Sequence, residues 1–171
     1  SVMMNMRNPG GLRAVSISPD GISGWSRPAF DNQLIDPNNF GSLVRYSFEE
    51  ESGKSRILFI NANDAHHRRN ITLRMSIDEG KTWTYSRTIQ PGQGQYAEVG
   101  VAPDGTIHIL YERGYGINAV RVNAAWLTTN NQLERLQIDG GELQPAFNGT
   151  VFDYEFHVRK NVEKIRLSAN L

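Results

Sequence analysis

The side chains of this chain that could do chemistry lie in short clusters, and their types restrict what each cluster can do. The sequence has no cysteine, which excludes disulfide bonds, zinc sites built on thiolates and cysteine nucleophiles. His66 and His67 are neighbours, but with four histidines and no cysteine we expect no metal centre and no cofactor. Asp78 and Glu79 are adjacent carboxylates, a residue type that general acid/base catalysis uses. The residues around them indicate a structural role instead.

The segment around these carboxylates fits the pattern S-x-D-x-G-x-T-W at every defined position, with Ser76, Asp78, Gly80, Thr82 and Trp83. In such a pattern the aspartate side chain caps backbone N–H groups of a tight turn, and the glycine permits a positive φ. The tryptophan then folds back into an apolar seam, where its indole N–H can find a carbonyl. We therefore expect a structural hairpin staple here, and no acid/base dyad.

A weaker copy of the pattern runs from Ser18 to Trp25. It keeps the serine, Asp20 and the tryptophan, but Ile22 and Gly24 stand where the glycine and the threonine belong. Two copies of one staple favour a fold assembled from repeated β-sheet units.

Short β-rich runs carry these motifs, and helical periodicity is almost absent. The expected strands are Leu12 to Ser18, Ser42 to Phe48, Arg56 to Asn61, Ile71 to Ser76, Val99 to Ala102, Thr106 to Glu112 and Ile117 to Val122. Turns are expected between them at Pro19-Asp20-Gly21, Glu79-Gly80, Pro91-Gly92 and Pro103-Asp104-Gly105. Strands at this spacing are typical of a β-sandwich, a barrel or a propeller.

Bulk composition is that of a globular protein, with 171 residues of which 39% are hydrophobic. The 18 basic and 18 acidic residues cancel, so no overall field favours nucleic acid or an anionic membrane as a partner. No apolar run approaches the ~20 residues of a membrane span. Ser1 to Met6 lacks the features of a signal peptide and is typical of a strand, so we expect the chain to begin inside a fold.

The sequence changes character after Thr128. A polar linker begins at Thr129, and the strands expected beyond it are Phe152 to Val158 and Val162 to Leu167. We expect two domains, residues 1–128 and residues 129–171, the second being the start of a small β-sandwich module. Gly140-Gly141, Pro145-Ala146-Phe147 and the strand with Tyr154 resemble cadherin-like modules of bacterial surface proteins.

Residues 2–128 as a series resemble the C-terminal part of the bacterial sialidases, whose Asp box (BNR repeat) is the S-x-D-x-G-x-T-W pattern. The resemblance rests on a series of segments in chain order. The first are Asn5-Met6-Arg7 before Leu12 to Ser18, then Phe40 to Leu43, then Arg68 to Arg74 leading into the motif. Gln95 to Val99 and Leu110-Tyr111-Glu112 follow, and Ala119 to Asn123 with Trp126 to Thr128 resembles the strand that ends the propeller. It implies an all-β fold, a partial six-bladed β-propeller followed by the truncated β-sandwich. It also implies a secreted, periplasmic or cell-surface bacterial glycosidase acting on sialylated glycans.

The family resemblance assigns the nucleophile to Tyr96. A sialoside carries a carboxylate on the carbon that undergoes substitution, so an anionic Asp or Glu would be repelled there and a neutral phenol is used instead. A phenol with a pKa near 10 needs a neighbouring base to activate it. An ordinary half-buried strand tyrosine is the alternative interpretation of Tyr96.

The same resemblance implies that three arginines bind the substrate carboxylate. Arg7 matches the second of them and Arg68 the third. A guanidinium donates two parallel N–H bonds to a carboxylate, which lysine cannot do. Arg69 takes the role of Arg68 if the register slips by one residue, and either side chain could instead be part of a solvated turn. Glu112 matches the glutamate that holds the first arginine and offsets the repulsion among the three.

The first arginine, the acid/base aspartate and the glutamate that activates the tyrosine all precede Arg7 in the family, so none of them is assigned here. Six blades of about 40 residues need well over 240 residues. We therefore expect residues 1–128 to require the N-terminal part of the same propeller, because an open half would expose sheet edges. Two other functions remain open: an acidic-sugar-binding propeller without catalysis, and sialyl transfer, including the intramolecular kind.

Overall fold

In the computed structural model, residues 1–129, 135–139, 141–144, 146–147, 154–158 and 160–170 are described. The chain divides into two compact units, Ser1–Thr128 and Thr129–Leu171. Nearly all regular structure is β, as expected. Among the described residues, neither helix has the length and apolar character that a membrane crossing requires.

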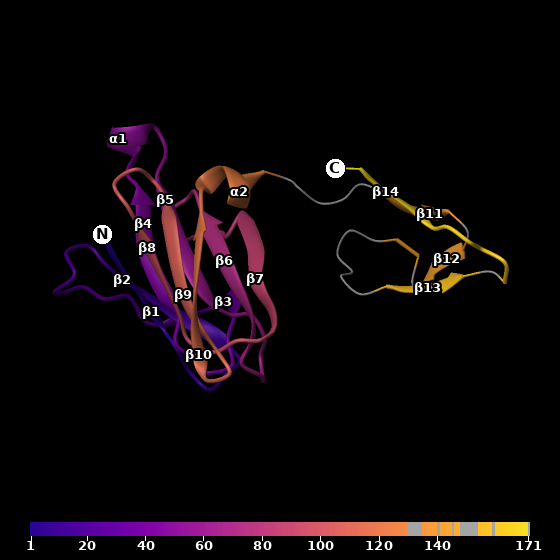
Figure 1. Cartoon of the computed structure of the whole chain (residues 1–171). Helices are drawn as coiled ribbons and strands as arrows, with labels where there is room; N and C mark the ends of the chain where they lie inside the picture. The colour runs from indigo at the N-terminus through magenta and orange to yellow at the C-terminus, as the bar shows by residue number, and fades with distance from the viewer. Residues whose placement is uncertain (130–134, 140, 145, 148–153, 159, 171) are drawn as a thin grey trace. The chain divides into compact units, whose positions relative to one another are not determined.

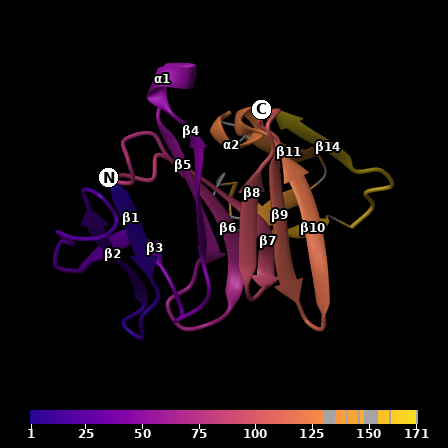
Figure 2. The ribbon, with the colours of Figure 1, turned by 90° about the vertical axis from the view of Figure 1, so that its left-hand side faces the viewer.

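Three antiparallel sheets make up the first unit, and in each of them consecutive strands are neighbours (Figures 1 and 2). The first sheet contains β1 (Val2–Met6), β2 (Leu12–Ser18) and β3 (Ala29–Ile35). The second contains β4 (Ser42–Ser47), β5 (Arg56–Ala62), β6 (Arg69–Ser76) and β7 (Tyr85–Gln93). The third contains β8 (Ala97–Val101), β9 (Ile107–Arg113) and β10 (Gly116–Val122).

Figure 2 shows these sheets side by side in chain order, from indigo through magenta to orange. This arrangement is the one expected of an open part of a β-propeller, and within the described residues the sheets do not close into a ring.

Two apolar cores join neighbouring sheets. The larger lies between the second and third sheets and is lined by side chains that alternate along the strands, among them Leu58, Leu73, Val99 and Ile109. The alternation follows from the pleat, which points every second side chain to the same face. The smaller core lies between the first and second sheets and contains Leu34, Ile57, Phe59 and Trp83. These contacts fix the angle between successive sheets.

The expected strands of the first unit form, but two local expectations are wrong and one helix was not expected. Pro91-Gly92 does not separate strands: it lies inside β7, at the edge of its sheet, where the register shifts and Gly92 has φ +71°. A proline at an edge strand loses no ladder hydrogen bond, and a bulge accommodates the glycine. Trp126 to Thr128 belong to a short helix, α2 (Ala124–Thr128), which buries Leu127 and follows β10 as a separate element. A second helix, α1 (Glu49–Ser52), was also not expected.

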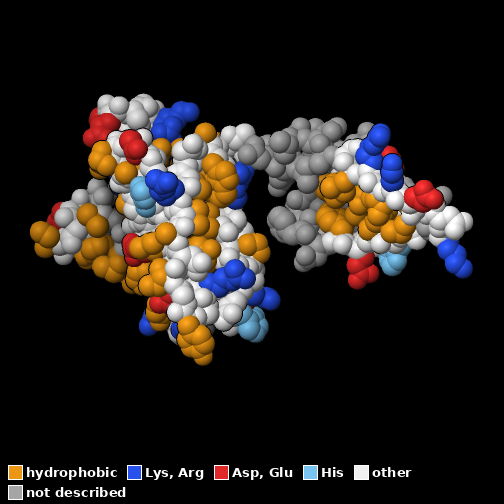
Figure 3. Space-filling view, in the orientation of Figure 1, with side chains coloured by type: hydrophobic (Ala, Val, Ile, Leu, Met, Phe, Trp, Pro, Cys, Tyr) orange, Lys and Arg blue, Asp and Glu red, His pale blue; other side chains and the backbone are white. Residues whose placement is uncertain are grey.

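The second unit contains two separate antiparallel pairs. β11 (Arg135–Asp139) pairs with β14 (Arg166–Asn170), and β12 (Gly141–Gln144) pairs with β13 (Glu155–Val158). Hydrophobic side chains gather on one face of this unit (Figure 3), and Val158, Ile165 and Leu167 are exposed. Gly140, Pro145 and residues 148–153, which include the start of the expected strand Phe152 to Val158, lie outside the described residues. The cadherin-like module stays a prediction.

Candidate active site

The predicted site residues lie where strands begin or end. Arg7 directly follows β1, Arg68 directly precedes β6, and Tyr96 directly precedes β8. Glu112 lies near the end of β9 and is partly buried. Strand ends of this kind position side chains on loops while the sheets keep those loops fixed.

Arg68 and Tyr96 are in contact. The guanidinium carbon of Arg68 lies 5.2 Å from the centre of the Tyr96 ring, a cation–π distance. Nη1 of Arg68 also donates to Oε1 of Gln95, a weak hydrogen bond at 3.4 Å. Tyr96 is 37% exposed, so its ring is supported by protein on one side and reaches solvent on the other. A phenol that contacts a cation and meets solvent is accessible to an anionic ligand.

The neighbouring Arg69 lies in a different environment. Its Nε donates to Oδ2 of Asp64 at 2.5 Å. The same carboxylate accepts from the backbone N–H groups of His66 and His67, which lowers the pKa of Asp64. The turn before β6 is therefore held by Asp64 and Arg69. Of the two arginines left open by the sequence, Arg68 is the one beside Tyr96.

Tyr96 and Glu112 are joined through the backbone. The N–H of Glu112 donates to the carbonyl of Tyr96 at 2.9 Å, and the N–H of Gln95 donates to the carbonyl of Glu112 at 2.9 Å. Two consecutive residues, Gln95 and Tyr96, thus pair with the single residue Glu112 of β9, which is the pattern of a β-bulge. Bulges redirect side chains at the ends of strands, and here the redirected side chain is that of Tyr96.

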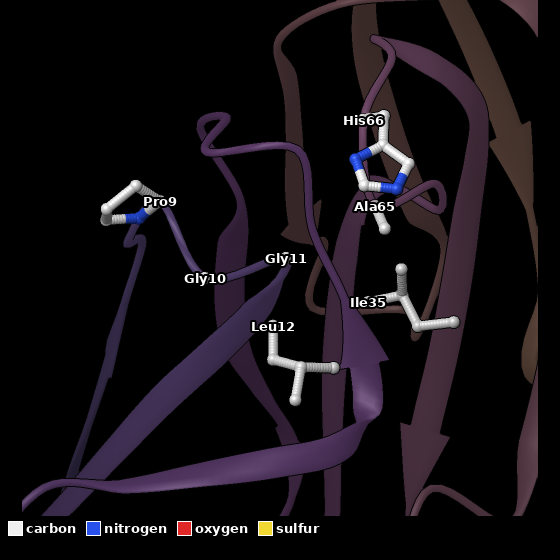
Figure 4. Close-up of a pocket in the computed structure, with 7 residues that line it drawn as sticks. All are labelled: Pro9, Gly10, Gly11, Leu12, Ile35, Ala65 and His66. Atoms are coloured by element: carbon white, nitrogen blue, oxygen red, sulfur yellow. The ribbon is translucent and has the colours of Figure 1, made fainter.

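Arg7 is exposed, and its charge reaches the buried Arg13 on β2. Burial lowers the pKa of Arg13, Asp36 opposes that shift, and the positive charge of Arg7 adds to it. The turn after Arg7 and the loop before Arg68 border one pocket of about 460 Å³, lined by Pro9, Gly10, Gly11, Leu12, Ile35, Ala65 and His66 (Figure 4).

The first unit also contains a buried polar network, which no sequence motif marks. Nη1 of Arg13 lies 3.2 Å from Oδ2 of Asp36, and the same oxygen accepts from Nδ2 of Asn61 at 3.0 Å. Oδ1 of Asn61 in turn accepts from Nη1 of Arg74 at 2.9 Å. Burial lowers the pKa of Arg74 to about 10, against the nearby charges of Asp31 and Asp36. Alternating donors and acceptors keep these charges compatible with burial.

The S-x-D-x-G-x-T-W motif forms the expected turn. Oδ1 of Asp78 accepts from the N–H of Thr82 at 2.8 Å, and Oδ2 accepts from the Thr82 hydroxyl at 2.7 Å. The Ser76 hydroxyl accepts from the N–H of Gly80, which has φ +76°. Glu79 pairs instead with both terminal nitrogens of Arg45. Trp83 donates its indole N–H to a carboxylate, that of Asp31, rather than to a carbonyl.

The weaker copy makes the same turn with one residue fewer between the aspartate and its hydroxyl partner. Oδ1 of Asp20 accepts from the N–H of Ser23, three residues along rather than four, and the Ser23 hydroxyl donates to Oδ2. The Ser18 hydroxyl accepts from the N–H of Gly21, which has φ +78°. The glycine and hydroxyl missing at positions 22 and 24 are thus supplied by Gly21 and Ser23.

Among the described residues, no group of three or more histidine, aspartate or glutamate side chains is arranged to hold a metal ion. Of the four predicted site residues, Arg68, Tyr96 and Glu112 are connected by the contacts described above, and Arg7 is not among the residues that make these contacts.

No protein-family profile matches the chain, but individual proteins are similar to it. A sialidase of Micromonospora viridifaciens is 38% identical over 131 residues, covering 74% of this chain and 20% of its own length. A sialidase of Bacteroides fragilis (strain YCH46) is 31% identical over 117 residues, covering 65% of this chain and 22% of its own length. The solved structure of Hadza microbial sialidase Hz136 matches with a TM-score of 0.63 and 30% identity, over 73% of this chain and 25% of that one. The chain spans about a fifth of the length of the curated relatives it matches. By sequence and by fold, it is a partial chain of the sialidase family.

Proposed function

We propose that the complete protein is an exo-α-sialidase, a retaining glycosidase that releases terminal α-linked sialic acid from glycoconjugates outside the cytoplasm. The observation that supports this most directly is the contact of Arg68 with Tyr96, at 5.2 Å, in a chain of sialidase sequence. An anion-binding group and a neutral nucleophile are thereby held side by side. A sialoside offers a carboxylate and an electrophilic carbon side by side as well.

In this proposal the phenol oxygen of Tyr96 attacks the anomeric carbon while the bond from that carbon to the aglycone oxygen breaks. The phenol proton passes to a base, and the aglycone oxygen receives a proton from an acid, both supplied by parts of the propeller that precede this chain. Water then cleaves the tyrosyl–sugar bond from the opposite side, so two inversions give net retention. Arg7 and Arg68 hold the carboxylate by charge-assisted hydrogen bonds, and Glu112 offsets the repulsion among the cations.

The test is release of the fluorophore from an aryl α-sialoside by the complete enzyme and by its Tyr96→Phe variant. Turnover is expected to fall by orders of magnitude in the variant, with the fold intact. Tyr115→Phe is the matched control, because Tyr115 is fully exposed on the β9–β10 hairpin. Unchanged turnover in Tyr96→Phe would remove Tyr96 from the mechanism.

Two further outcomes distinguish the other functions. Sialic acid binding by the complete protein without any turnover identifies a non-catalytic binding propeller. NMR of the products separates hydrolysis, which gives free sialic acid first as the α-anomer, from transfer to a second sugar or closure to an anhydro sugar.

A further inference from the structure

Asn39 is a polar side chain with 0% exposure, in the segment that connects β3 to β4. Its backbone and its side chain make three separate hydrogen bonds. The N–H donates to Oδ1 of Asp36 at 2.8 Å, and the carbonyl accepts from Nη1 of Arg13 at 2.7 Å. The side-chain Nδ2 donates to the carbonyl of Gln95 at 2.8 Å. The residue therefore joins the buried Arg13–Asp36 pair to the residue directly before Tyr96.

The segment that carries Asn39 is fixed at both ends. At its start, the N–H of Asp36 donates to the carbonyl of Gly11 at 3.0 Å. Asn38 adopts φ +59°, which asparagine tolerates better than most residues and which turns the chain toward β4. At its end, a Cβ on Gly41 would lie 2.9 Å from the Phe59 ring, so the backbone packs directly on β5. Asn39 thus extends from a rigid support.

The residues that directly follow Asn39 and Gln95, Phe40 and Tyr96, are also in contact with each other. The ring of Phe40 meets the ring of Tyr96 edge to face, with 5.9 Å between the ring centres. Residues 39 and 40 therefore contact residues 95 and 96 in register, one pair through a hydrogen bond and the other through aromatic rings. Arg68 covers the Tyr96 ring and also donates to the Gln95 side chain. The orientation of the phenol depends on where the backbone at residue 95 is held.

One feature argues that Asn39 is more than a space-filling residue. Its Oδ1 is buried and has no hydrogen-bond partner within residues 1–129. An unpaired buried acceptor is unfavourable, and a smaller residue would remove that cost. What the amide provides in return is the donor that bonds to the Gln95 carbonyl.

We propose that Asn39 is the positioning residue of the nucleophile: its amide transmits the rigidity of the Arg13–Asp36 pair to Gln95 and so sets the orientation of Tyr96. The expected effect of Asn39 on turnover rests on the proposed function, in which Tyr96 is the nucleophile. The expected effect on the orientation of the Tyr96 ring does not. The hydrogen-bond partners of Asn39 are Asp36, Arg13 and Gln95, and the phenol oxygen of Tyr96 is not among them. It acts through the backbone of Gln95.

The matched control is Asn61→Ala. Asn61 has the same residue type and the same 0% exposure, and it bonds to the same Asp36, but its Nδ2 reaches the carbonyl of Ile35 rather than the Tyr96 segment. Both asparagine-to-alanine variants remove one buried amide from one network. Only the Asn39 variant removes the bond to Gln95.

The experiment uses the complete enzyme with 3-fluorotyrosine at position 96 and measures ¹⁹F NMR and aryl α-sialoside turnover on the same samples. In Asn39→Ala we expect a shifted or broadened fluorine signal and a kcat at least tenfold lower, with KM within threefold. In Asn61→Ala we expect a lower melting temperature, an unchanged fluorine signal and a kcat within threefold. Equal effects of the two variants on the fluorine signal and on kcat would overturn the proposal.

A second variant covers the case in which Asn39→Ala does not fold. Asn39→Asp keeps the size and, when protonated, regains a donor toward the Gln95 carbonyl; as a carboxylate it repels that oxygen. Its kcat relative to the parent enzyme should therefore rise as the pH falls through the titration of the new carboxyl group, and a flat ratio would overturn the proposal. A parent enzyme without any sialoside turnover would instead contradict the proposed function, while the fluorine signal would still test the positioning.

Discussion

The indole N–H of Trp83 donates to Oδ2 of Asp31 at 3.0 Å, across the boundary between two sheets. Trp83 ends the aspartate turn of the second sheet, whereas Asp31 lies on β3 of the first. The tryptophan ring also packs against Phe59, with 5.6 Å between the ring centres. The motif thus fastens its own hairpin and attaches it to the preceding sheet.

Trp83→Phe keeps most of the apolar contact but leaves the Asp31 carboxylate without its indole donor. We expect a loss of about 1–3 kcal/mol in the free energy of unfolding, measured by urea denaturation of the full-length protein. Trp25→Phe is the control, since the Trp25 indole has no hydrogen-bond partner within residues 1–129 and is only partly buried. Equal losses in the two variants would show that the Asp31 bond contributes nothing.

Gly80→Ala tests whether the same turn is fitted to β1. A Cβ there would overlap Cε of Met3, in a backbone with φ +76°. Gly53→Ala shares the positive φ, +68°, but its Cβ meets nothing within 4 Å. We expect about 1–2 kcal/mol of destabilisation from φ alone in both, and more in Gly80→Ala because Met3 must move. In the Met3→Ala background the difference between the two glycine variants should vanish, as measured by urea denaturation.

Acid should weaken the contact between Glu79 and β4. Hydrogen bonds from Arg45 and Ser55 lower the pKa of Glu79 to about 2. A carboxylate whose pKa falls on folding stabilises the native state above its unfolded pKa, near 4.5, and this contribution is lost as the pH falls toward 2. The melting temperatures of the parent and Glu79→Gln should therefore differ at pH 6 and converge by pH 2. Glu51→Gln, on the exposed helix α1, is the control, and a difference that stays constant with pH would contradict the prediction.

Arg68→Lys should weaken substrate binding while Arg69→Lys should not. Lysine keeps the charge but loses the planar pair of donors, at a cost of about 1.5–3 kcal/mol for a charge-assisted bond, or about 10- to 100-fold in KM for an aryl α-sialoside. Arg69 pairs with Asp64 and faces a different neighbour. If the larger rise in KM follows Arg69→Lys, the arginine roles are reversed.

Much of the fold follows from the sequence because strand alternation and turn residues are local signals. β2 has the bounds that the pattern predicts. β3 was missed because it is polar and mostly exposed, with Leu34 as its buried residue, so no apolar alternation marks it. β7 was also missed, and Pro91-Gly92 was interpreted as a turn because a bulge at a sheet edge has the same composition as a turn.

The site was predictable only in part. The family pattern singled out Arg68 and Tyr96, and the structure shows their contact, although their catalytic roles stay predictions. Asn39 could not have been found, because an asparagine after Pro37-Asn38 has the composition of a solvated loop. Its burial depends on Arg13 and on Gln95, which are distant in the chain and become neighbours only when three sheets assemble.

The two aspartate turns also show how copies of this motif can differ in sequence and still form the same hydrogen bonds. The same oxygen atoms receive the same kinds of hydrogen in both, although the glycine and the hydroxyl partner each stand one position earlier in the first copy. Both copies are eight residues long from serine to tryptophan, so nothing is deleted and the two residues shift together. A search that lets these two positions shift together would recover degenerate copies that a rigid pattern overlooks.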